Sequence, residues 1–136
     1  MINSLKIFFE PKSIAVVGAS ERQGSIGRAI MVNLLERFKG KIYPINIKYD
    51  TVFGLKCYKS ILEVPEPIDI AVVAVPAPIV PQVAEECGKK RVKGLIVISA
   101  GFKEIGGEGI EREQKLLEVV KKYGMRMIGP NCLGIY

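Results

Sequence analysis

The chain has 136 residues, of which 49% are hydrophobic and 25% are charged, and its formal net charge is +6 at pH 7. This length and composition predict a single domain over residues 1–136 with a core of its own, and they exclude an intrinsically disordered chain. Because no apolar run is long enough to cross a membrane and no signal-peptide core follows Met1, we expect a cytoplasmic protein with no membrane partner.

Basic residues cluster at 89–93 and 121–122, where two helices are predicted to end. Cations are favoured at helix C-termini, and no aromatic residues interleave with this charge. We therefore interpret the positive charge as a solvated surface and expect no nucleic-acid partner.

The sequence contains three cysteines and no histidine. The cysteines, Cys57, Cys87 and Cys132, are too widely spaced to indicate a disulfide framework or a zinc site. Histidine is the commonest general base and the commonest metal ligand, so its absence favours a chain without metal or catalytic residues of its own.

In chain order, strand and helix patterns alternate. Residues 14–17 form an apolar run typical of a buried strand, and a helical pattern over 26–38 follows, with Ser25 as its N-cap and Ile26 on its apolar stripe. The other elements expected in this half are a lead-in of one or two helical turns at 2–9, a strand at 41–47, a loop at 51–56, a short strand at 56–58 and a helical turn at 60–63.

The second half begins with the most hydrophobic run, residues 68–75, which predicts a central parallel strand. A helix at 79–89 would place Ile79, Val83 and Cys87 on one face, which we interpret as core. The remaining expectations are a strand at 94–99, a glycine-rich loop at 101–109, a helix at 110–123 presenting Ile110, Leu117 and Val120, and a strand at 125–128.

This order predicts an α/β fold: a Rossmann-like, doubly wound parallel sheet of about five to six strands, with helices on both faces. In such sheets the ligand binds outside the carboxyl ends of the strands, where the strand order reverses. That rule gathers four segments into one crevice, namely residues 18–27, 46–48, 75–78 and 99–102.

The turn after the first strand is typical of a phosphate site. A strand that ends at Gly18 leads through a polar turn containing Gly24 to the helix that starts near Gly27. The first amides of a helix lack intrahelical partners and carry the positive end of its dipole, so a glycine turn lets a phosphate approach them. The alternative is that Gly18 and Gly27 only allow the strand and the helix to pack closely.

The dinucleotide fingerprint G-x-G-x-x-G is not met, because Ser20 stands where its second glycine should be. Lys48 follows the second long strand, where an NAD site would place a carboxylate, and this cation suits a phosphate. An NAD(P)-binding domain of an oxidoreductase stays open, because Lys48 would also suit NADP and Asp50 lies nearby. Lys48 could equally be a surface cation.

Five motifs in order carry a resemblance: PKSIAVVGAS at 11–20 with GSIG at 24–27, YPINIK at 43–48, AVP at 74–76, SAGF at 99–102 and GPNCLG at 129–134. Together they resemble the CoA-binding domain of the NDP-forming acyl-CoA synthetases, which include ADP-forming acetate–CoA ligases and the α subunit of succinyl-CoA synthetase. The resemblance covers nearly the whole chain.

The resemblance implies that the ligand is coenzyme A or an acyl-CoA. It places CoA phosphates at the start of the helix, a nucleotide phosphate on Lys48, and the channel toward the thiol beside the later strands. The residues expected to contact CoA are Gly18, Ala19, Ser20, Gln23, Gly24, Ser25, Ile26, Gly27, Asn46, Lys48, Val75, Pro76, Ile98, Ser99 and Ala100.

The resemblance also implies partners, because the family's catalytic phosphohistidine lies in a following domain and an ATP-grasp domain or subunit binds its nucleotide. We therefore expect a binding module that is not catalytic alone. It would serve an enzyme that converts acyl-CoA, ADP and phosphate into acid, ATP and CoA. A free-standing CoA-binding regulator is a further alternative.

Overall fold

The computed structural model of the protein describes residues 7–98 and 107–129. Residues 2–6 of the expected lead-in and 101–106 of the expected glycine-rich loop lie outside the described residues. No helix in the described part of the chain is long and apolar enough to cross a membrane.

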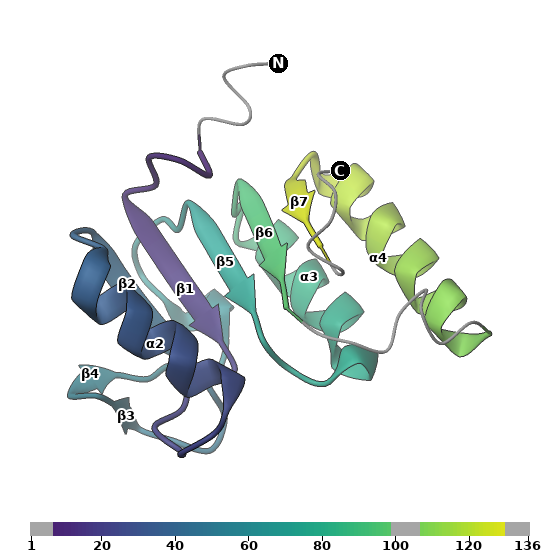
Figure 1. The fold of residues 1–136 in the computed structure, drawn as a ribbon. Helices are drawn as coiled ribbons and strands as arrows, with labels where there is room; N and C mark the ends of the chain where they lie inside the picture. Colours follow the sequence, from purple (N-terminus) through teal and green to yellow (C-terminus); the bar gives the residue numbers. More distant parts are fainter. Residues whose placement is uncertain (1–6, 99–106, 130–136) are drawn as a thin grey trace.

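A five-stranded parallel sheet forms the centre of the fold, in the order β2-β1-β5-β6-β7 (Figure 1). The register places Val17 opposite both Ile45 and Val73. The strands are short and apolar, as expected where both faces of a parallel sheet are covered. They are β1 (Ser13–Val17), β2 (Lys41–Ile45), β5 (Ile70–Val73), β6 (Gly94–Val97) and β7 (Arg126–Ile128).

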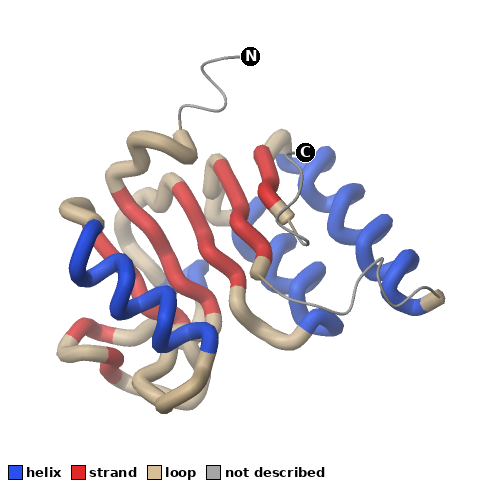
Figure 2. The backbone as a smooth tube through the Cα atoms, in the orientation of Figure 1, coloured by secondary structure: helices blue, strands red, loops and turns tan. Residues whose placement is uncertain are grey.

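Helices cover both faces of this sheet. α2 (Ile26–Arg37) packs on β1 and β2, whereas α3 (Val80–Lys89) and α4 (Glu108–Tyr123) lie together on the opposite face (Figures 1 and 2). The chain runs from β1 outward to β2 and returns to β5 on the other side of β1, so the strand order reverses between β1 and β5. This arrangement confirms the predicted Rossmann-like, doubly wound fold.

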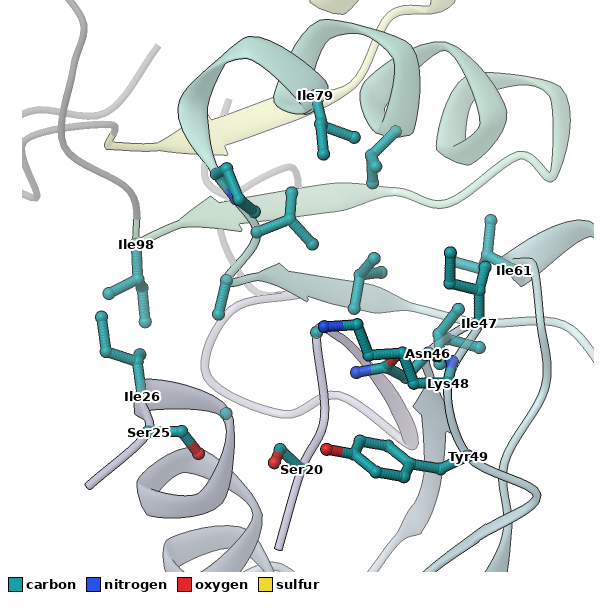
Figure 3. Close-up of a pocket in the computed structure, with 18 of the residues that line it drawn as sticks. Ser20, Ser25, Ile26, Asn46, Ile47, Lys48, Tyr49, Ile61, Ile79 and Ile98 are labelled. Carbon is teal, nitrogen blue, oxygen red and sulfur yellow. Dashed lines mark hydrogen bonds between the residues drawn. The ribbon is translucent and has the colours of Figure 1, made fainter. Parts of the chain in front are cut away.

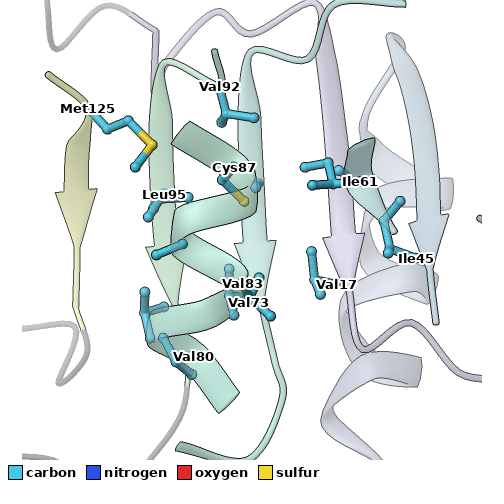
Figure 4. Close-up of a cluster of buried hydrophobic side chains, with 14 of the residues drawn as sticks. Val17, Ile45, Ile61, Val73, Val80, Val83, Cys87, Val92, Leu95 and Met125 are labelled. Atoms are coloured by element: carbon cyan, nitrogen blue, oxygen red, sulfur yellow. The ribbon is translucent and has the colours of Figure 1, made fainter. Parts of the chain in front are cut away.

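Two hydrophobic clusters fill the spaces between the sheet and the helices. Because successive strand residues point to opposite faces, Val17 belongs to the cluster under α3 and α4, and Val16 belongs to the one under α2. Cys87 is fully buried beneath the sheet with Val83 and Leu95 (Figure 4), which confirms its interpretation as a core residue.

The prediction of a loop at 51–56 is wrong, because these residues form an antiparallel hairpin of β3 (Thr51–Val52) and β4 (Leu55–Lys56). Phe53 and Gly54 both have positive φ, 50° and 78°, which suits the two-residue turn of a hairpin. Val52 is buried against the cluster under α2, and this packing anchors the hairpin. The short strand expected at 56–58 shrinks to a single bridge between Tyr58 and Ile45.

The prediction that three helices bury an apolar stripe along their whole length is wrong at their first turns. Ile26, Ile79 and Ile110 are 55%, 48% and 44% exposed. The helices begin at the carboxyl edge of the sheet, so their first turns extend past the core, and residues further along, such as Met31 and Leu116, are buried instead. In the last helix Val120 is buried as expected, while Leu117 is only partly buried.

Several helix boundaries follow the sequence signals. Ser25 caps α2, and Gly124 ends α4 in the left-handed conformation, as expected for glycine after a helix. The helical turn expected at 60–63 is the short helix η1 (Ile61–Glu63), capped by Ser60. A second short helix, η2 (Ala77–Ile79), precedes α3. α4 starts at Glu108, inside the stretch expected to be loop.

Candidate functional site

A pocket of about 840 Å³ opens at the carboxyl edge of the sheet, where β1, β2 and β5 end (Figure 3). Its walls come from the start of α2, the residues after β2, and the first turns of η2 and α3. It lies where the strand order reverses, as expected for this fold. The pocket therefore unites the first three predicted segments, while residues 99–102 lie outside the described residues.

Most of the predicted contact residues line this pocket. Ala19 and Gln23 do not, and Ser99 and Ala100 lie outside the described residues. The predicted residues that line it are Gly18, Ser20, Gly24, Ser25, Ile26, Gly27, Asn46, Lys48, Val75, Pro76 and Ile98.

Close packing accounts for two of the three glycines. A Cβ at Gly18 would overlap the carbonyl oxygen of Ala74, and one at Gly27 would overlap the carbonyl oxygen of Gly18. Gly24 is different: like Gly18 (φ +96°) it has a positive φ, +80°, but a Cβ there would meet nothing within 4 Å. The close packing of helix on strand that the alternative expects is present at Gly27, and it brings the start of α2 onto the end of β1.

The first turn of α2 presents unpaired backbone donors to the pocket. The Ser25 side chain accepts a hydrogen bond from the amide of Arg28 (3.1 Å) and donates one to the carbonyl of Arg22 (2.8 Å). The amides of Ile26 and Gly27 have no acceptor among the residues that the structure describes. Free donors at the positive end of a helix dipole are the arrangement that favours an anion, so we refer to this turn as the candidate anion site.

Asn46 braces the two loops that flank this anion site. Its side-chain nitrogen donates to the carbonyl of Ala19 (2.9 Å), and its side-chain oxygen accepts from the amide of Lys48 (2.9 Å). The amides of Gly18 and Ala19 donate to the carbonyl of Ile45, at 2.9 and 3.3 Å. The amides of residues 18 and 19 are therefore occupied within the protein, and Asn46 positions the loops.

Among the described residues that line the pocket, cationic side chains outnumber acidic ones. Lys48 and Arg22 are exposed, and neither side chain has an ion pair or hydrogen bond within the described part of the chain. Lys59 also lines the pocket, but it pairs with Asp50 at 3.1 Å. Glu86 is the acidic lining residue, and it accepts a hydrogen bond from Ser60 (2.9 Å). This balance favours an anionic ligand.

The pocket also has apolar lining residues. Ile26 and Ile98 lie on the far side from Lys48 and Tyr49, and Ile79 lies beside α3 (Figure 3). Because Ile26 and Ile79 remain about half exposed, they offer apolar surface that a ligand could cover. The pocket thus suits a ligand with an anionic part and an apolar arm.

Several lining residues were missed from the sequence. Gln82 and Glu86 could have been found, because they share a helical face with Ile79 once that face is recognised as pocket and not core. Lys59 and Ser60 reach the site only because the β3–β4 hairpin folds back, which no local pattern indicates. The missed polar residues are Arg22, Tyr49, Lys59, Ser60, Gln82 and Glu86.

Comparison with known sequences agrees with this site. A family model described as the CoA binding domain matches residues 12–136. The chain is 57% identical over 131 residues to an ADP-forming acetate–CoA ligase of Methanocaldococcus jannaschii, covering 96% of this chain and 18% of that protein. It is 53% identical over 137 residues to the alpha subunit of ADP-forming acetate–CoA ligase I of Pyrococcus furiosus, covering 97% of this chain and 30% of that subunit.

A solved structure shows the same fold in a longer protein. Dinucleotide-forming acetyl-coenzyme A synthetase 1 of Ca. Korarchaeum cryptofilum, in complex with phosphate and ADP, superposes with a TM-score of 0.88 at 48% identity. The match covers 93% of this chain and 27% of that one, so the chain spans less than a third of each of these relatives. The chain belongs to the CoA binding domain family, whose ligand is the coenzyme A that the sequence motifs led us to expect.

Proposed function

We propose that this chain is the CoA-binding domain of an ADP-forming acyl-CoA synthetase and that its pocket binds CoA or an acyl-CoA. The observation that supports this most directly is that one pocket combines free amides at a helix start and several cations with apolar lining residues. CoA has both matching parts, with phosphates on its nucleotide and a long pantetheine arm that ends in the thiol.

The pocket suggests how CoA would lie. The diphosphate would sit on the free amides of Ile26 and Gly27, beside Ser20. Lys48 would hold a phosphate of the nucleotide, and the pantetheine arm would follow Val75, Pro76 and Ile98 toward the thiol end. Ser99 and Ala100 continue this path in the sequence and stay part of the proposal, whereas Ala19 and Gln23 would support the turn without lining the pocket.

The chain's role in the reaction would be to bind and orient CoA. With no histidine in the sequence, the phosphoryl transfers would depend on a phosphohistidine-bearing domain and an ATP-grasp domain or subunit. The relatives support such partners, because they are several times longer than this chain, or, in Pyrococcus furiosus, form an alpha subunit.

Calorimetric titration of the chain with CoA tests the proposal, with NAD and NADP as comparison ligands. We expect saturable CoA binding and weaker or no binding of the two dinucleotides. Absence of saturable CoA binding at millimolar concentration would refute the proposed function. Tighter binding of NADP than of CoA would favour the oxidoreductase alternative instead.

A further inference from the structure

Tyr49, the residue after Lys48, carries a hydroxyl into the pocket that the protein itself does not use. The ring is half-buried and packs against the hydrophobic cluster under α2. The residue lines the pocket, and its hydroxyl has no hydrogen-bond partner within the described residues. In Figure 3 this hydroxyl is directed toward Ser20 and the start of α2.

The backbone around Tyr49 is held in place without a ligand. The ammonium group of Lys59 donates to the carbonyl of Tyr49 (2.8 Å) and pairs with the Asp50 carboxylate (3.1 Å). The amide of Cys57, which follows the hairpin, donates to the carbonyl of Asp50 (2.8 Å). On the other side, the amide of Lys48 is tied to Asn46. The phenol therefore has a fixed position before ligand binding, which lowers the entropic cost of any bond it makes.

The region toward which the Tyr49 hydroxyl is directed contains hydrogen-bond donors. The amides of Ile26 and Gly27 are unpaired. The Ser20 hydroxyl already accepts a bond from the amide of Arg22 (2.9 Å), so it too has a hydrogen left to donate. A phenol directed toward several donors fits an anion that accepts from all of them.

We propose that the Tyr49 hydroxyl donates a hydrogen bond to the diphosphate of CoA and closes the anion site on the side opposite the start of α2. This inference rests on the proposed function. It assigns adjacent residues to different phosphates: Tyr49 to the diphosphate and Lys48 to the 3′-phosphate.

Titration of Tyr49→Phe with CoA and with dephospho-CoA, which lacks only the 3′-phosphate, tests the assignment. The substitution keeps the ring packing and removes one hydroxyl. Because a hydrogen bond to a charged group is lost, we expect affinity for both ligands to fall by the same factor, about tenfold. Tyr58→Phe is the matched control, since that tyrosine does not line the pocket, and it should bind both ligands as the wild type does.

Each contrary result has a distinct meaning. CoA affinity of Tyr49→Phe equal to that of the wild type would overturn the inference while leaving the proposed function intact. A larger loss for CoA than for dephospho-CoA would place Tyr49 on the 3′-phosphate and would also overturn it. Failure of the wild type to bind CoA would instead refute the proposed function on which the inference rests. If the variants and the wild type have equal melting temperatures, the losses of affinity are due to binding and not to unfolding.

Discussion

Gly27 at the first turn of α2 packs directly on the backbone of Gly18 at the end of β1. A side chain at residue 27 would overlap the Gly18 carbonyl oxygen, so this contact sets how closely the helix approaches the strand. It also determines where the free amides of Ile26 and Gly27 lie, and it therefore links the packing of the domain to its anion site.

Gly27→Ala should accordingly damage both stability and binding. The added methyl group must displace backbone atoms, and such overpacking costs about 1–3 kcal/mol. Gly24→Ala is the matched control: its Cβ would meet nothing within 4 Å, so only the positive φ is penalised, by about 1 kcal/mol. Urea denaturation should show the larger loss for Gly27→Ala, and an equal or smaller loss would contradict the role assigned to the contact.

Lys48→Ala should weaken the binding of CoA more than the binding of dephospho-CoA. If the ammonium group holds the 3′-phosphate, its loss lowers CoA affinity by about tenfold and leaves dephospho-CoA nearly unchanged. Lys39→Ala, which removes an exposed lysine outside the pocket lining, should change neither affinity. Equal losses for the two ligands in calorimetric titration would refute the assignment of Lys48.

Ile79→Ser should weaken CoA binding and have little effect on the stability of the fold. The side chain is 48% exposed and lines the pocket, so we expect a change of about 0.5 kcal/mol or less in the free energy of unfolding. CoA affinity should fall severalfold because covered apolar area is lost. Ile110→Ser is the control, since Ile110 is 44% exposed in the first turn of α4 and does not line the pocket. Similar CoA affinities in both variants would argue against an apolar contact with the pantetheine arm.

Burial of Cys87 should make the domain less stable in alkaline solution. Desolvation raises the pKa of this thiol to about 12, from 9.0 in the unfolded chain. The folded state therefore holds a proton that the unfolded state releases, so the stabilisation is complete below pH 9 and is lost as the pH rises from 9 toward 12. We expect Cys87 to contribute a decline of about 1 kcal/mol between pH 9 and pH 10.

Denaturant melts of the wild type and of Cys87→Ala across this pH range isolate that contribution. The variant starts from lower stability because a small core side chain is truncated, but its stability should fall less steeply with pH. Parallel curves for the two proteins would show that Cys87 is not the group responsible.

Local sequence patterns predicted a feature correctly where that feature depends only on residues close together in the sequence. The unbroken apolar runs identified strands buried on both faces, and Ser25 and Gly124 marked helix ends because capping depends only on neighbouring backbone groups. They failed at Ile26, Ile79 and Ile110, because helical periodicity identifies an apolar face but not where that face leaves the core. The hairpin at 51–56 was missed because its stability comes from burying Val52 against distant residues.

The sequence by itself determined the fold class, the family and three segments that meet at the ligand edge, since these follow from the order of apolar runs, glycines and motifs along the chain. Only the tertiary structure decided which donors remain free. Asn46 and Ala19 are occupied by their neighbours, whereas the hydroxyl of Tyr49, whose backbone carbonyl accepts a hydrogen bond from Lys59, has no partner among the described residues. Whether a polar group is available to a ligand depends on which distant groups fold against it, and no local pattern in the sequence contains that information.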